Sequence, residues 1–291
     1  MSYNALKEIE EVCEREKIEF WEAVLLEDMD SRKVTKENSM NTMQSLWEAM
    51  LLAGNNYNKN EHSASGLVGG DGGRMEDYYK EQDSFCGSFI SMVIAQALQM
   101  GESNACMKRI VAAPTAGACG VLPAVLLPLF REKGITKEQI IESLYVSAGI
   151  GEVIAKRAFI AGAAGGCQAE VGTASAMASG ALVHIKGGKP YQITSAVAMT
   201  LKNLLGLVCD PVAGLVEVPC IKRNVIGAMN ALSCADMALA GITSKIPADQ
   251  VIDAMKAVGE RMDVSLRETS LGGLAATPAA QEITKRLAKQ R

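Results

Sequence analysis

Aromatic side chains are scarce in this sequence, since Phe, Trp and Tyr together make up 4% of its 291 residues. Histidine is scarcer still: His62 and His184 are the only two. This scarcity argues against a catalytic triad centred on histidine. Lys and Arg form no long runs, and the formal net charge is −4. We therefore expect no nucleic-acid partner, because neutralising phosphates requires a basic face.

A secretory signal is not recognisable either, because the opening MSYNALKEIEEVCEREK is charged and amphipathic. Eight cysteines without such a signal are typical of cytosolic thiols rather than of a disulfide framework. We expect a cytoplasmic protein.

One uncharged run, IVAAPTAGACGVLPAVLLPLF over 110–130, is long enough to cross a membrane. It contains three prolines, however, and no other uncharged run has a similar length. We expect a turn followed by a fully buried helix, and no membrane partner.

Ala, Val, Ile, Leu and Met supply most of the apolar content, together with 27 Gly, and this composition suits closely packed helices. Apolar spacing and capping signals predict helices over 35–54, 85–101 and 137–149, and another that begins at Pro247. KPYQIT is the one strand-like fragment, and the polar, Gly-rich residues 55–84 are predicted to form the longest loop. We predict a single all-α domain over 1–291, with 1–60 as a candidate helical flap.

Three cysteines stand out by their setting. Cys167 opens a small-residue helix, where unpaired N–H groups and the positive end of the helix dipole favour a thiolate. Cys209 and Cys220 enclose CDPVAGLVEVPC, which two prolines prevent from forming a continuous helix. Their spacing does not match the closely spaced pairs of a structural zinc site. Three thiolates with an open fourth position suit an iron–sulfur cluster, and the alternative is that they bind no metal.

The other cysteines are expected to be structural, since a buried Cys usually behaves as a small hydrophobic residue; they are Cys13, Cys86, Cys106, Cys119 and Cys234.

SASGLVGGDGG, over 63–73, is rich in glycine but lacks the Gly-Lys-Ser/Thr ending of a P-loop. Its successive N–H groups could hold a carboxylate or phosphate, and the alternative is a flexible surface loop. Glu170 lies one turn after Cys167 and is expected to face the same way. Lys222 and Arg223 are the cations nearest the thiols, unless they are simply solvated. His184 ends a helix, where it could serve only as a C-terminal charge.

Five motifs in order resemble the iron–sulfur L-serine dehydratases, specifically the α chain of the two-chain form. They are SGLVGGD, APTAGACGVLPA, GCQAEVG, CDPVAGLVEVPCIKRN and LRETSLGGLAATP, and the resemblance covers about 40–280. It implies a [4Fe–4S] cluster held by Cys167, Cys209 and Cys220. It also implies removal of water from L-serine to give aminoacrylate, which hydrolyses to pyruvate and ammonia without pyridoxal phosphate. An iron without a protein ligand would act as the Lewis acid for the departing hydroxide.

The resemblance also implies which residues hold the amino acid: Ser65, Gly66, Gly69, Gly70, Asp71, Thr115, and Lys222 or Arg223. Removal of the α-proton needs a positioned base. Glu170, Lys222 and His184 are the candidates, and a group from another chain is the alternative.

The sequence departs from the family at two points. Val68 stands where members often have Thr, and the single-chain members carry an additional N-terminal domain and a C-terminal Cys that this chain does not show. We therefore expect a β chain to cover the site, and apolar surface to be exposed near the Gly-rich loop. Two other functions remain open: an L-cysteine desulfidase with the same chemistry, and a non-catalytic cluster-binding subunit.

Overall fold

The computed structural model describes residues 3–289, and these form thirteen α-helices and three short 3₁₀ turns, without a β-strand among them. The prediction of an all-α fold is confirmed. In chain order the elements are α1 (Leu6–Glu16), α2 (Phe20–Arg32), α3 (Lys36–Asn55), α4 (Asp71–Glu81), α5 (Gly87–Ala105), α6 (Val121–Glu132), α7 (Lys137–Arg157), α8 (Gly162–Gly165), α9 (Cys167–Ile185), α10 (Pro190–Leu204), η1 (Val212–Gly214), α11 (Cys220–Leu239), α12 (Ala248–Arg261), η2 (Val264–Leu266), η3 (Gly273–Ala276) and α13 (Pro278–Ala288).

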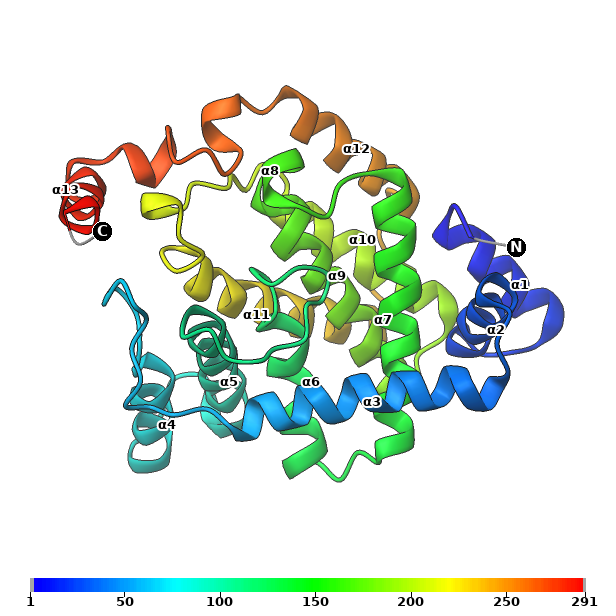
Figure 1. Ribbon diagram of the computed structural model, residues 1–291. Coiled ribbons are helices and arrows are strands. Elements are labelled where there is room, and N and C mark those ends of the chain that lie inside the picture. The colour runs from blue at the N-terminus through cyan, green and yellow to red at the C-terminus, as the bar shows by residue number, and fades with distance from the viewer. Residues whose placement is uncertain (1–2, 290–291) are drawn as a thin grey trace.

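Helix α9 is the centre of the bundle, with α7, α10 and α11 packed against it (Figure 1). Almost every residue of α9 is buried, and most of them are Ala, Gly or Ser. Small side chains allow the neighbouring helices to approach closely. At Gly180 the approach is so close that a Cβ atom would lie 2.2 Å from Ile150 Cδ1 in α7. The small-residue composition therefore sets the spacing of the core.

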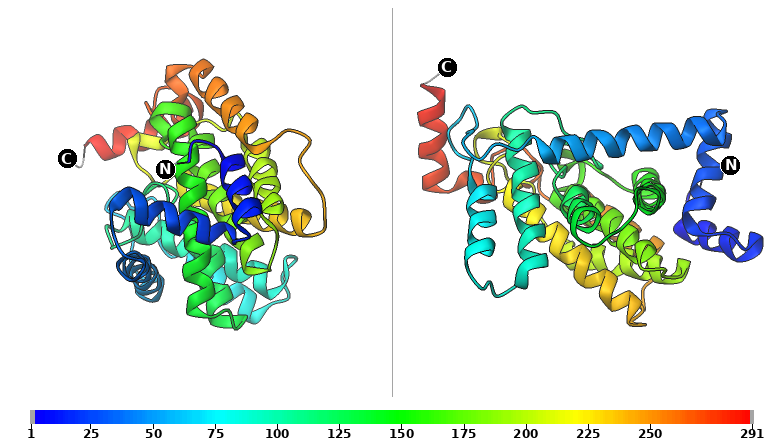
Figure 2. Two further views of the ribbon diagram at one scale, coloured as in Figure 1. Left: turned by 90° about the vertical axis from the view of Figure 1, so that its right-hand side faces the viewer. Right: turned by 90° about the horizontal axis from the view of Figure 1, so that it is seen from below.

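The first three helices bury side chains in the same hydrophobic cluster as the central ones, including Leu6, Phe20 and Trp47. Helix α3 runs along one side of the bundle as a single long rod (Figure 2). Trp47, on α3, packs edge-on against Phe130, with the ring centroids 5.3 Å apart. Residues within 1–60 thus contribute to the main core. Helices α1 and α13 lie at opposite ends of the molecule (Figure 1).

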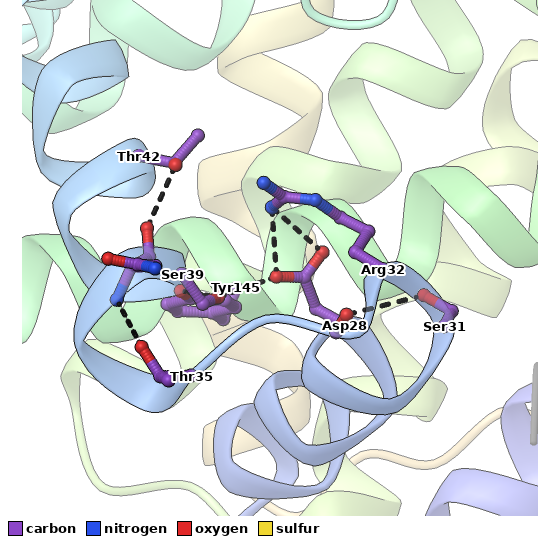
Figure 3. Close-up of polar contacts among 8 residues, drawn as sticks. Asp28, Ser31, Arg32, Thr35, Ser39, Thr42 and Tyr145 are labelled. Atoms are coloured by element: carbon purple, nitrogen blue, oxygen red, sulfur yellow. Dashed lines mark hydrogen bonds and ion pairs between the residues drawn. The ribbon is translucent and has the colours of Figure 1, made fainter.

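A polar network joins α2, α3 and α7 (Figure 3). Ser39 Oγ donates to Asp28 Oδ2 at 2.5 Å and lies 2.6 Å from the Tyr145 hydroxyl. Arg32 forms an ion pair with the same Asp28 at 3.1 Å. Because Ser39 and Tyr145 are both buried, this network fixes how the N-terminal helices sit on α7.

The capping signals identified two helix starts correctly. Thr35 caps α3 by accepting from the N–H of Asn38, and Thr136 and Gln139 form a capping box at the start of α7. Helix α7 ends at Arg157, beyond the predicted 149. Helix α6 follows a turn and is buried over its first nine residues, as predicted. Within the described residues, no helix is long and apolar enough to span a membrane.

Two local predictions are wrong. KPYQIT is not a strand but begins α10, where Pro190 occupies the first turn and Gln192 accepts from the N–H of Lys189. Proline suits that position because its fixed φ is already helical and its missing N–H is not needed. The predicted loop over 55–84 contains helix α4.

Candidate active site

Three cysteines that are far apart in the sequence lie in one buried region. Cys167 is the first residue of α9, as expected, and Cys220 is the first residue of α11. Cys209 lies in the loop after α10, where its N–H donates to the Leu266 carbonyl at 2.8 Å and its carbonyl accepts from the Glu268 N–H at 2.7 Å. The exposed fractions of the three cysteines are only 2%, 3% and 7%. The segment 266–268 therefore holds Cys209 in place from a distant part of the chain.

The three thiols are close enough to affect one another electrostatically. Burial raises the pKa of Cys167 to about 11 and that of Cys220 to about 12, and it also raises the pKa of Cys209. Negative charge on Cys167 raises the pKa of both other thiols further. All three thiols are therefore protonated at neutral pH, chiefly because burial disfavours the thiolates and also because neighbouring thiolates would repel one another.

Arg223 is the cation at this cluster, and its charge lowers the pKa of Cys167 and of Cys220. The side chain is only 12% exposed, and Nη2 lies 2.8 Å from Asp210 Oδ1. Nη1 donates to the Val208 carbonyl at 2.8 Å. These contacts hold a guanidinium beside the thiols, and the alternative that Arg223 is simply solvated does not fit them.

Glycines next to the cysteines leave the space that the thiols occupy. A Cβ atom on Gly162, in α8, would lie 2.7 Å from Cys209 Sγ. Gly166 precedes Cys167 with φ +78°, and a Cβ there would lie 2.6 Å from the Met262 side chain. The GAAGG sequence before Cys167 is therefore required both by backbone conformation and by packing.

Glu170 lies close enough to the three cysteines for its charge to raise the pKa of all three thiols. Its Oε1 accepts a hydrogen bond from Thr115 Oγ1. Gly117 lies so close that a Cβ there would be 2.6 Å from Glu170 Oε1. Burial raises the pKa of Glu170, the hydrogen bond from Thr115 lowers it, and the charge of Glu268 raises it further. The structure thus brings Thr115 and Glu170 to the cysteines.

The Gly-rich loop is fixed to the Cys209–Cys220 segment by a buried carboxylate. Glu217 Oε2 accepts from Ser65 Oγ at 2.5 Å and from Ser63 Oγ at 3.0 Å. Lys222 Nζ also reaches Asp71 Oδ2 at 3.0 Å. These contacts place the loop beside the start of α11, so it is not the free surface loop of the alternative interpretation.

Some N–H groups of this loop are used within the protein. Gly66 N–H donates to the Ser63 carbonyl at 2.9 Å, and Asp71 N–H donates to Glu102 Oε1 at 2.7 Å. Gly69 and Gly70 have φ of +140° and +81°. A Cβ on Gly69 would lie 2.4 Å from the Glu61 carbonyl oxygen, so only glycine fits there.

The structure also places Val68 and His184. The Val68 side chain is buried in a small apolar cluster with Leu98 and Ile221. His184 lies at the opposite end of α9 from Cys167, about 25 Å away at 1.5 Å per residue. Its ring nitrogens face Glu19 and Glu142 instead, and burial lowers its pKa. The structure does not bring His184 to the cysteines.

Lys222, another candidate for the base, has a side chain that is 71% exposed and paired with Asp71. The sequence did not single out three acidic residues that the structure places at the Gly-rich loop and the cysteines: Glu102, Glu217 and Glu268. Glu268 lies in the LRETS motif and has φ +62°, unusual for a residue with a side chain. That motif was the only signal for it.

The donor set fits an iron–sulfur cluster better than a single ion. Within residues 3–289, no three His, Cys, Asp or Glu side chains are arranged to hold one metal ion. In a cluster each cysteine binds a different iron, so its thiols need not converge on one point. Three buried thiols, an adjacent guanidinium and Gly162, which leaves room for Cys209 Sγ, are compatible with such a cluster.

Comparison with known proteins gives a consistent match. The family model described as "Serine dehydratase alpha chain" matches residues 15–275. The chain is 45% identical to a probable L-serine dehydratase alpha chain of Bacillus subtilis, over 98% of this chain and 95% of that one. It is 40% identical to the L-serine dehydratase alpha chain of Peptoniphilus asaccharolyticus, over 99% of both chains. It is 36% identical to an L-serine dehydratase of Helicobacter pylori, over 94% of this chain and 62% of that protein.

Proposed function

The chain belongs to the serine dehydratase alpha-chain family, and we propose that it converts L-serine to pyruvate and ammonia. The observation that carries the proposal is the assembly of three buried cysteines with Glu170, Thr115 and Arg223 from separate segments of the chain. Relatives named L-serine dehydratase support the choice of substrate.

We propose that Cys167, Cys209 and Cys220 hold a [4Fe–4S] cluster. When bound, the cluster would supply a Lewis-acidic iron without a protein ligand, which assists the departure of hydroxide from L-serine. Binding requires the three thiols to lose their protons, and Arg223 favours this loss at Cys167 and Cys220.

Glu170 is the best-placed of the three candidates for the base that takes the α-proton. It lies among the thiols, whereas Lys222 is paired at the surface and His184 is at the far end of α9. Thr115 holds Oε1 by a hydrogen bond, so the carboxylate is oriented before the substrate arrives. In this proposal the Gly-rich loop, which Glu217 fixes through Ser65, would contact the carboxylate of the amino acid through the region of Gly69 and Gly70.

A partner β chain would cover this site. The segment that follows Glu268 lies beside Cys209, because Leu274 N–H donates to Asp210 Oδ2 at 2.7 Å and Ser270 Oγ donates to the Pro211 carbonyl at 2.7 Å. Its apolar side chains point outward: Leu271 is 72% exposed and Leu274 is 44% exposed. Exposed apolar residues next to a site are typical of an interface, and covering them would exclude water from the reaction.

The test of the function is pyruvate and ammonia release from L-serine by the chain prepared without oxygen, with and without the β chain. The proposal predicts both products in equal amounts when the two chains are combined. Release of sulfide from L-cysteine, without turnover of L-serine, would instead identify a desulfidase. No turnover of either substrate by the pair would leave the cluster-binding subunit as the function.

Glu170→Gln separates the base from the cluster. We expect the variant to keep the iron content of the wild type but to lose at least about 100-fold in kcat, since a general base contributes about 10²–10⁴-fold. The matched control is Glu260→Gln, an exposed residue of α12. If Glu170→Gln turns over L-serine at the wild-type rate, another group takes the proton.

A further inference from the structure

A cavity lies apart from the cysteine site, at the ends of α3 and α6 where they meet α4 and α5. Its volume is about 570 Å³, within the range of small-molecule sites. Its inner wall includes the buried residues Gly54, Gln96 and Gln99, while Asn55 and Arg131 lie at its exposed rim. None of the three cysteines, Thr115 or Glu170 lines it.

Gln96 leaves an unused donor in this cavity wall. The residue is 3% exposed, and its Oε1 accepts from Arg131 Nη1 at 2.8 Å. Its Nε2 is buried, and no hydrogen-bond partner is found for it among residues 3–289. Buried amide nitrogens almost always have an acceptor, so this donor is free to bind an oxygen atom of a ligand.

Four charged side chains line the cavity: Glu76 and Lys80 pair with each other at 2.5 Å, and Arg131 and Glu132 are the other two. Arg131 Nη2 donates to Asn55 Oδ1 at 2.7 Å, but across the described part of the chain no carboxylate forms an ion pair with Arg131. The neighbouring Glu132 likewise has no cationic partner within that part. One cation and one anion, adjacent in sequence and lining the same cavity, therefore remain available to a ligand.

Gly54 is a point of close packing between α3 and α6 beside both donors. A Cβ atom at this position would lie 2.5 Å from Leu127 Cδ1, 3.2 Å from Arg131 Nη2 and 3.6 Å from Gln96 Nε2. Only glycine therefore lets this wall of the cavity pack against Leu127 while Arg131 and Gln96 keep their positions.

Gln99 and Tyr57 line the same wall, but their donors are used within the protein. Gln99 Nε2 donates to Glu76 Oε2 at 2.9 Å. The Tyr57 hydroxyl donates to Glu102 Oε2 at 2.7 Å.

We propose that this cavity is a binding site for a free α-amino acid. Its carboxylate would accept from Arg131 and from Gln96 Nε2, and its ammonium group would lie against Glu132. A guanidinium with an amide donor is well suited to a carboxylate, and the carboxylate of Glu132 makes the site complementary to a zwitterion rather than to a simple anion. The site shares no residue with the proposed dehydration and does not depend on it.

Calorimetric titration of the full chain with each of the twenty common L-amino acids tests the proposal. We expect at least one of them to bind with a stoichiometry of one in the Cys167→Ser variant, in which the cysteine site is altered. The amine that lacks the carboxylate of that amino acid should bind at least tenfold more weakly. Arg131→Met should weaken the amino acid at least tenfold, whereas Arg261→Met, at an exposed arginine of α12, should not change it.

Glu132→Gln provides a second variant at an exposed position, so the test does not depend on Arg131→Met remaining folded. It should weaken the amino acid while leaving the melting temperature unchanged. The proposal is overturned if no amino acid binds with a Kd below about 10 mM, if Glu132→Gln binds as tightly as the wild type, or if binding disappears in Cys167→Ser.

Discussion

Glu102 is a buried carboxylate that fixes the start of helix α4, and its removal should destabilise the protein strongly. The residue is 2% exposed. Its two oxygens accept from the Tyr57 hydroxyl at 2.7 Å, from Asp71 N–H at 2.7 Å and from Gly72 N–H at 3.2 Å. Glu102→Ala leaves these three donors without their acceptor.

The expected cost follows from the number of unsatisfied donors. A buried donor that loses its acceptor costs about 1–3 kcal/mol, and Asp71 is exposed enough for water to replace part of the loss. We therefore expect Glu102→Ala to lower the free energy of unfolding by about 3–5 kcal/mol, a drop of about 10 °C in melting temperature. Urea unfolding followed by circular dichroism measures the change.

Glu260→Ala, at an exposed position in α12, is the control and should change the free energy of unfolding by less than about 0.5 kcal/mol. Because α4 carries Asp71 and follows the Gly-rich loop, Glu102→Ala should also raise the KM for L-serine if the proposed function holds. A loss of stability below about 1 kcal/mol would refute the reasoning, since it would mean that the three donors find other partners at no cost.

Three further predictions concern the core and the thiols. Gly180→Ala should destabilise the protein by about 1–3 kcal/mol in urea unfolding, because its Cβ would overlap a buried isoleucine of α7. In the same helix, the Cβ of Gly172→Ala would meet no atom closer than 3.8 Å, so this variant should stabilise the protein by up to about 1 kcal/mol. Equal effects of Gly180→Ala and Gly172→Ala would show that packing does not limit this helix. Tyr145→Phe removes the hydroxyl that contacts a buried serine in α3, and it should lower the free energy of unfolding by about 1–2 kcal/mol. An unchanged unfolding curve would contradict the importance of the network in Figure 3. Burial raises the pKa of Cys119 from 9.0 to about 12, so the thiol ionises at lower pH in the unfolded chain than in the folded protein. The free energy of unfolding should therefore fall as the pH rises from about 9 to 12. The fall should be steeper in the wild type than in Cys119→Ala. At pH 8 a thiol reagent should label the exposed Cys86 in the folded protein and Cys119 only after denaturation.

The helix starts that sequence analysis located correctly depend on residues only three positions apart. Thr35 with Asn38 and Thr136 with Gln139 carry their own signal, whatever the rest of the chain does. Helix α4 was missed because its first turn contains two glycines after Asp71 and little apolar periodicity. Its start is stabilised by Glu102, which lies 31 residues away from Asp71 in the sequence.

In the candidate site, too, the sequence showed the local features but not the long-range contacts. The settings of the cysteines were visible locally, in a glycine-rich helix start and a proline-shaped loop. Their proximity was not, because it arises from helix packing and from the pairing of Cys209 with residues 266–268. Glu217 was also missed, since its partner Ser65 is 152 positions away. His184 was named as a candidate base, but it ends the helix that Cys167 begins, and a rise of 1.5 Å per residue separates the two by about 25 Å.

The central claim is that Cys167, Cys209 and Cys220 together hold an iron–sulfur cluster, and counting iron and acid-labile sulfide in the chain reconstituted without oxygen tests it most directly. The account predicts about four irons and four sulfides per chain in the wild type and in Cys234→Ser, a buried thiol in the middle of α11. It predicts almost none in Cys209→Ser. A full complement of iron and sulfide in Cys209→Ser would contradict it.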